Sequence, residues 1–122
     1  SELNDYLADF DKQLIVERLL QLLVEAASDI NAYLLVEIHG RTPESYFDSF
    51  IEAGRRKILD LEFAQELAQA SGLRNRLVHQ YEEIDNSIVF QAIQEALNQF
   101  PAYIRQIMTY LDALEAGNDT KS

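Results

Sequence analysis

The chain has 122 residues, 48% of them hydrophobic, and a formal net charge of −11 at pH 7. This length supports one domain with one hydrophobic core, and four Gly and two Pro argue against disorder and against a turn-rich β-fold. The lack of cysteine excludes disulfides and thiolate metal sites, and the acidic excess leaves RNA binding dependent on a local basic patch or a partner.

The N-terminal third predicts a short amphipathic segment and then one long helix. Residues 3–10 give one or two helical turns, and residues 11–39 follow helical spacing throughout. One stripe of this helix holds Ile15, Leu19, Leu22, Leu23, Ala26, Ile30, Tyr33, Leu34 and Ile38. Val16, Leu20, Val24 and Ala27 widen the stripe, which predicts burial on two sides, either in a bundle or across a dimer interface. Gly40 is the expected C-terminal stop.

Two shorter helices are expected next. Thr42 and Pro43 are typical of an N-cap and a first helical residue, with Glu44 in the first turn. This helix should bury Tyr46, Phe47 and Phe50 and end near Gly54. After the cationic run of residues 55–57, Asp60 is the expected N-cap of a helix carrying Leu61, Phe63, Ala64, Leu67 and Ala68. Ser71 and Gly72 should break or kink it.

The C-terminal third predicts another long helix. Asp85 is its expected N-cap, apolar positions recur from Val89 to Leu114, and Pro101 should kink it. Residues 117–122 form a polar, flexible tail behind a single domain of residues 1–116. No run of ~18 uninterrupted apolar residues and no signal pattern occurs, so we expect a soluble protein without a membrane partner. The fold class is therefore predicted as an all-α, antiparallel bundle of four to five helices.

The residues from Ser71 to Tyr81 concentrate the chemistry of the chain. They hold Arg74, Asn75, Arg76, His79 and Tyr81 within three helical turns. On a helix Asn75 and His79 share a face, whereas Arg74 and His79 diverge by about 140° and would flank a groove. A solvated helix face is the alternative interpretation of this cluster.

The string Arg74-Asn75-x-x-x-His79-x-Tyr81 resembles the R-x4-6-H signature of the HEPN superfamily, and in particular its HepT-like branch of ribonuclease toxins. The order of elements from Ile15 to Leu114 resembles the same branch. The resemblance implies metal-independent RNA cleavage without a cofactor, in a homodimer whose two motifs line one cleft. It also implies a cytoplasmic toxin paired with an MntA-like nucleotidyltransferase antitoxin.

The resemblance assigns a role to each motif residue. His79 would be the general acid or base, since imidazole titrates near neutrality. Arg74 would clamp the phosphate through paired hydrogen bonds. Asn75 and Arg76 would position the substrate. Tyr81 would receive AMP from the nucleotidyltransferase, which would add negative charge to the site and silence it.

Other interpretations stay open at this point. The protein is alternatively a non-catalytic docking subunit for a nucleotidyltransferase, and Tyr81 an ordinary half-buried tyrosine. His39 is expected to be a helix-end residue rather than a ligand. Glu17, Glu25 and Asp29 are expected to be solvated. The cationic run of residues 55–57 would contact RNA or a partner, or neutralise nearby acids. No metal-binding motif is present.

Overall fold

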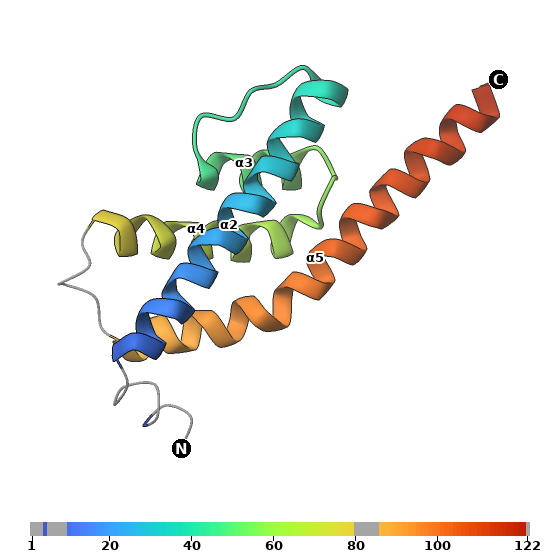
Figure 1. Cartoon of the computed structure of the whole chain (residues 1–122). Helices are drawn as coiled ribbons and strands as arrows, with labels where there is room; N and C mark the ends of the chain where they lie inside the picture. Colours follow the sequence, from blue (N-terminus) through green and yellow to red (C-terminus); the bar gives the residue numbers. More distant parts are fainter. Residues whose placement is uncertain (1–3, 5–9, 80–85, 122) are drawn as a thin grey trace.

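The computed structural model describes residue 4 and residues 10–79 and 86–121 (Figure 1). Within those ranges the chain forms α-helices and no strand, which confirms the all-α prediction. The helices are α2 (Phe10–His39), α3 (Tyr46–Arg55), α4 (Leu61–His79) and α5 (Asn86–Lys121). Apart from residue 4, the segment predicted before α2 lies outside the described residues, as does the expected N-cap Asp85.

The helices meet around one core. Figure 1 shows α2 lying across α3 and α4, with α5 running beside them and its C-terminal end projecting past the other helices. All four helices supply buried apolar side chains, and the central ones are Leu35, Phe50, Ala64 and Tyr103. The Phe50 and Tyr103 rings pack edge to face with centroids 6.5 Å apart, an arrangement that aromatic pairs favour.

A polar network crosses this core. The Tyr103 hydroxyl lies 2.7 Å from Asn31 Oδ1 and 3.0 Å from the carbonyl oxygen of Ala27. Asn31 Nδ2 donates to Ser49 Oγ at 3.4 Å, and the hydroxyls of Ser28 and Ser49 lie 2.8 Å apart. The network satisfies polar groups that burial would otherwise penalise, and it fixes α3 and α5 against α2.

Helix α2 is apolar on two opposite faces, as its wide stripe predicts. One face supplies Leu20, Val24, Ala27, Leu34 and Leu35 to the core. The opposite face exposes Ile15, Leu19, Leu22, Ile30 and Tyr33. The residues that widen the predicted stripe therefore form the core, and most of the stripe itself lies at the surface of the protomer.

The ends of α2 and α3 are set by local chemistry. Gly40 has φ of +63°, which confirms its place as the residue that ends α2. The predicted start of α3 at Thr42 and Pro43 is wrong: Ser45 is the N-cap, and its Oγ accepts from the Asp48 N–H at 3.0 Å. The Ser45 hydroxyl caps the third amide of the helix, so α3 starts three residues later than composition suggests. Phe47 is exposed, contrary to prediction, while Phe50 is buried.

Helix α4 begins as expected and continues further than expected. Asp60 Oδ2 accepts from the Phe63 N–H at 3.2 Å, which confirms the N-cap. The predicted break at Ser71 and Gly72 is wrong, because α4 runs unbroken to His79. The buried Ser71 hydroxyl bonds back to the Ala68 carbonyl at 2.7 Å, and a single helical glycine costs only about 1 kcal/mol.

Helix α5 contains Pro101 inside its span, and Figure 1 shows the helix changing direction along its length. Its backbone is helical to Lys121, beyond the start of the predicted tail at residue 117. The flexibility of that tail stays a prediction.

Residues 11–39 are also long and apolar enough to cross a membrane by length and composition alone. The helix contains no uninterrupted apolar run of that length, but its mean hydropathy is high and its central part carries few charges. Because α2 contributes one face to the core of the four helices, that part of its apolar composition has a structural explanation.

Candidate functional site

The motif segment forms the C-terminal part of α4. Arg74, Asn75, Arg76 and His79 belong to this helix, although their side chains lie outside the described part of the structure. Tyr81 lies outside the described residues altogether. The helical register still relates the four α4 positions to the core, because each residue advances by about 100°.

The helical register relates the motif positions to the described residues of α4. The buried residues of this helix are Ala64, Leu67, Ala68 and Ser71. Arg74 and Asn75 follow Ser71 by three and four residues, so they continue the same face one turn later. His79 follows Asn75 by four residues and borders this face. Arg76 is five residues beyond Ser71, which places it toward the opposite side.

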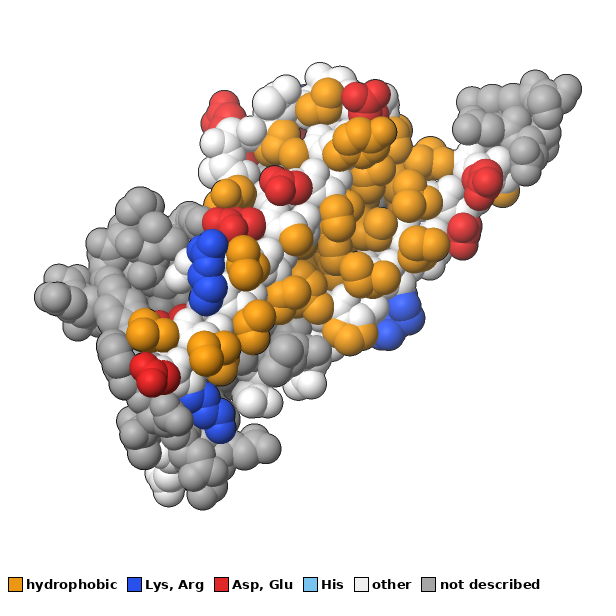
Figure 2. Space-filling model, in the orientation of Figure 1, with side chains coloured by type: hydrophobic (Ala, Val, Ile, Leu, Met, Phe, Trp, Pro, Cys, Tyr) orange, Lys and Arg blue, Asp and Glu red, His pale blue; other side chains and the backbone are white. Residues whose placement is uncertain are grey.

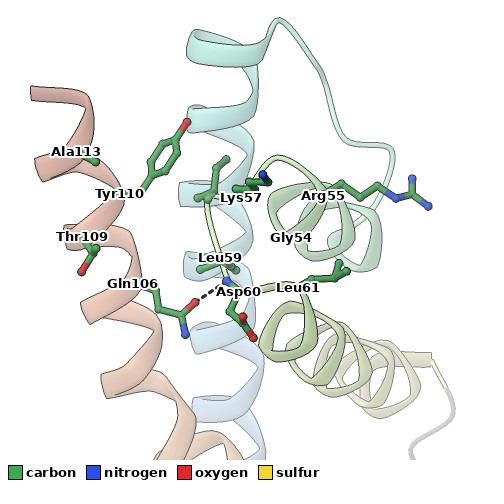
Figure 3. Close-up of a pocket in the computed structure, with 11 residues that line it drawn as sticks. Gly54, Arg55, Lys57, Leu59, Asp60, Leu61, Gln106, Thr109, Tyr110 and Ala113 are labelled. Carbon is green, nitrogen blue, oxygen red and sulfur yellow. Dashed lines mark hydrogen bonds between the residues drawn. The ribbon is translucent and has the colours of Figure 1, made fainter. Parts of the chain in front are cut away.

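Two contacts with α5 hold α4 in place. The Asp60 N–H, just before α4, donates to Gln106 Oε1 at 2.8 Å (Figure 3). In the second turn of α4, Glu66 Oε2 accepts a hydrogen bond from Gln99 Nε2 of α5 at 3.0 Å. The helix that carries the motif is therefore fixed from its first turn by α5.

One crevice among the described residues lies apart from the motif. It has a volume of about 860 Å³ and lies between the α3–α4 connection and α5 (Figure 3). Its lining is mainly apolar. The lining includes Asp60, whose carboxylate caps α4. Lys57 lies in the connecting turn with φ of +61°. Among these lining residues we find no acid–base pair suited to catalysis.

A second crevice of about 660 Å³ is polar and contains His39. The His39 Nε2 and the Tyr110 hydroxyl lie 2.9 Å apart, joining the end of α2 to α5. Arg56 lies 3.9 Å from Glu52, which also binds Arg55 at 2.8 Å. His39 therefore has a structural contact at its helix end, and two cations of the 55–57 run neutralise a nearby acid. Within the described residues, no group of three His, Asp or Glu side chains could hold a metal ion.

The burial of one polar residue of α2 is missed by sequence reasoning. Glu17 is predicted to be solvated, but it is only 3% exposed, and Gln13, one turn earlier on α2, is 5% exposed. Spacing contains the signal, since Gln13 and Glu17 share a face with Leu20 and Val24. The burial of Gln13 and Glu17 cannot be predicted from this spacing alone, because the apolar stripe of α2 is so wide that either face of the helix can be assigned to the core.

The fold agrees with comparisons to known proteins. The family model for ribonuclease HepT-like proteins matches residues 1–107. The chain belongs to the HepT-like ribonuclease family. A tRNA nuclease HepT of Aphanizomenon flos-aquae is 51% identical over 117 residues, covering 96% of this chain and 80% of the relative. An mRNA nuclease HepT of Shewanella oneidensis is 30% identical over 101 residues, covering 83% and 76%.

Solved HepT-like structures share the fold. The tri-AMPylated Shewanella oneidensis HEPN toxin in complex with MNT antitoxin superposes with a TM-score of 0.79 and 30% identity, covering 85% of this chain and 78% of that one. A toxin–antitoxin complex with AMP-PNP gives 0.78 and 29%, covering 84% and 78%. The family resemblance inferred from the motif is thereby confirmed.

Proposed function

We propose that this HepT-like protein is a metal-independent endoribonuclease and the toxin of a toxin–antitoxin pair. The observation that carries the proposal is the 51% identity to a tRNA nuclease HepT along 96% of the chain. The complete Arg74-Asn75-x-x-x-His79-x-Tyr81 string supports it.

The proposed cleavage uses a base and a fixed cation. His79 takes the proton of a ribose 2′-hydroxyl or returns one to the leaving oxygen. Arg74 stays protonated and binds the phosphate oxygens as charge grows on them. The register separates the two positions by five residues, so they approach a bound phosphodiester from different sides. Asn75 and Arg76 position the RNA strand.

The proposed active form is a homodimer. The exposed apolar face of α2 continues over α5, where Ile104, Met108 and Leu111 are exposed, and Figure 2 shows hydrophobic side chains gathered in one band over both helices. Monomeric proteins rarely expose contiguous apolar patches larger than a few hundred Å². Pairing through this band would bring two motifs together and double the local positive charge in a chain of net charge −11.

The proposed control is AMP transfer to Tyr81 by an MntA-like nucleotidyltransferase in the cytoplasm. A relative is seen tri-AMPylated in complex with MNT antitoxin, and another toxin–antitoxin structure carries a tyrosine-to-alanine substitution. A phosphodiester on Tyr81, two residues beyond His79, would place negative charge where the substrate phosphate binds.

One experiment tests catalysis and control together. Purified wild type, His79→Ala and Tyr81→Phe are incubated with RNA in EDTA, with and without the nucleotidyltransferase and ATP. RNA cleavage and intact mass are then measured. We expect wild type and Tyr81→Phe to cut RNA, and His79→Ala to be at least about 100-fold slower, the usual contribution of a general acid or base. AMP should add to wild type and His79→Ala only.

Either readout can contradict the proposal. Equal cleavage by His79→Ala would remove His79 from the chemistry. No cleavage by wild type, together with formation of a complex with the nucleotidyltransferase, would instead identify a non-catalytic docking subunit.

A further inference from the structure

The two faces of α2 differ in polarity, and the more polar face is the buried one. The face packed in the core includes polar residues that are each at most 5% exposed: Gln13, Glu17, Ser28 and Asn31. The opposite face exposes a row of large apolar side chains: Ile15, Leu19, Leu22, Ile30 and Tyr33. The hydrophobic effect follows apolar area and has no direction, so it gives little preference for the observed face over the opposite one.

Hydrogen bonds to two other helices distinguish the observed face. Asn31 Nδ2 donates to Ser49 Oγ of α3 at 3.4 Å, and Asn31 Oδ1 accepts from the Tyr103 hydroxyl of α5 at 2.7 Å. Ser28 Oγ lies 2.8 Å from the same Ser49 hydroxyl. A half-turn rotation of α2 about its axis would break these bonds. Ser49 and Tyr103, which are 0% and 1% exposed, would lose these partners inside the core, and that loss costs free energy.

We infer that the network of Ser28, Asn31, Ser49 and Tyr103 selects which face of α2 enters the core and leaves the other face for a second copy of the chain. A buried polar contact can fix the setting of a helix at some cost in stability, as single asparagines do in coiled coils. The selection is a property of one protomer, whereas its consequence for the dimer rests on the proposed function. If α2 took either setting, only a fraction of protomers would present the apolar face, and the apparent dissociation constant of the dimer would rise in inverse proportion to that fraction.

A network-free variant tests the selection. It replaces all four side chains by apolar ones: Ser28→Ala, Asn31→Leu, Ser49→Ala and Tyr103→Phe. Because no member of the network is left without its partner, the helical content should be unchanged and the melting temperature should stay within about 8 °C of wild type. Amide NMR spectra should nevertheless show two sets of signals for α2, where wild type shows one.

Thiol labelling reports which face is buried, because the chain has no cysteine. Val24 is 1% exposed on the core face, and Val24→Cys places a small apolar thiol there. In the wild-type background, labelling of dilute protein should be at least about 100-fold slower than in denaturant, because it requires opening of the core. In the network-free background this ratio should fall to roughly tenfold, as expected when about a tenth of the molecules turn Val24 outward.

Ser71→Ala is the matched control. The Ser71 hydroxyl is also fully buried, but it bonds within its own helix, to the Ala68 carbonyl at 2.7 Å. This variant should keep one set of amide signals and the wild-type labelling ratio.

The inference is overturned if either readout of the network-free variant matches wild type, because side-chain shape would then select the face without the network. Loss of helical structure in that variant would also overturn it, since the network would then supply stability rather than a choice between two settings. A wild type that stays monomeric at every concentration would contradict the proposed dimer, while the labelling of Val24→Cys would still decide the choice of face.

Discussion

At the scale of single residues, buried polar side chains determine how the helices fit together. The Tyr103 hydroxyl contacts two groups of α2, the Ala27 carbonyl and the Asn31 side chain, and Asn31 in turn donates a hydrogen bond to Ser49 of α3. Burial raises the pKa of Tyr103 far above its usual range, because the phenolate would have to form in the core.

Replacing Tyr103 with Phe tests this network. The ring still fills the core, but Asn31 and the Ala27 carbonyl lose their donor, so we expect a loss of about 1–2 kcal/mol in the free energy of unfolding at pH 7. A tyrosine with a raised folded-state pKa contributes stability below about pH 10 that is lost as the pH rises further. Urea denaturation at pH 7 and pH 10.5 should therefore show a steeper alkaline loss in wild type than in the variant. Parallel losses would contradict a buried phenol.

At the scale of helices, periodicity predicts most of the fold. The spans of α2 and α5 and the cap at Asp60 follow from apolar spacing and capping chemistry. Spacing alone cannot decide which face of α2 meets the core, because both are apolar, and for this reason the prediction of a solvated Glu17 is wrong. The start of α3 depends on a single serine hydroxyl, that of Ser45, which composition does not reveal. Helix α4 continues past Ser71 and Gly72, which spacing alone does not reveal. The motif was found from spacing and family resemblance; the arrangement of its side chains stays a prediction.

Two glycines should respond to alanine in opposite directions. A Cβ at Gly54 would lie 2.8 Å from Ala64 Cβ and 3.2 Å from Leu61 Cδ1, where α3 meets α4. Gly54→Ala should therefore destabilise the fold by about 1–3 kcal/mol through overpacking. A Cβ at Gly72, inside α4, would meet no described atom within 4 Å. Gly72→Ala should stabilise it by about 0.5–1 kcal/mol. Thermal unfolding of the two variants measures both effects, and a stabilised Gly54→Ala would contradict the close packing of α3 on α4.

At the scale of the whole molecule, the apolar band over α2 and α5 is the feature that a single protomer leaves unexplained. Leu19 of α2 and Met108 of α5 are each 52% exposed and are among the exposed apolar residues of these two helices. In the proposed dimer both would be buried against the partner.

Leu19→Glu tests that interface. Burying an unpaired carboxylate should cost about 3 kcal/mol and weaken association by roughly 100-fold. Leu61→Glu is the control, because Leu61 is 51% exposed in the first turn of α4, where a carboxylate suits the helix dipole. Light scattering after size exclusion should give a monomer mass for Leu19→Glu and a dimer mass for wild type and Leu61→Glu. One mass for all three would remove the band from the interface.

The two apolar faces of α2 link folding to mass action. The same thirty residues pack in the core of one protomer and, in the proposed dimer, against the partner protomer. Dissociation on dilution would therefore remove part of the contacts that stabilise α2. The melting temperature should then rise with protein concentration. Because two motifs would share one cleft, the cleavage rate at low concentration should grow with the square of the amount of protein. A toxin of this kind would be nearly inactive at low concentration, and its activity would increase steeply once the concentration allows dimers to form.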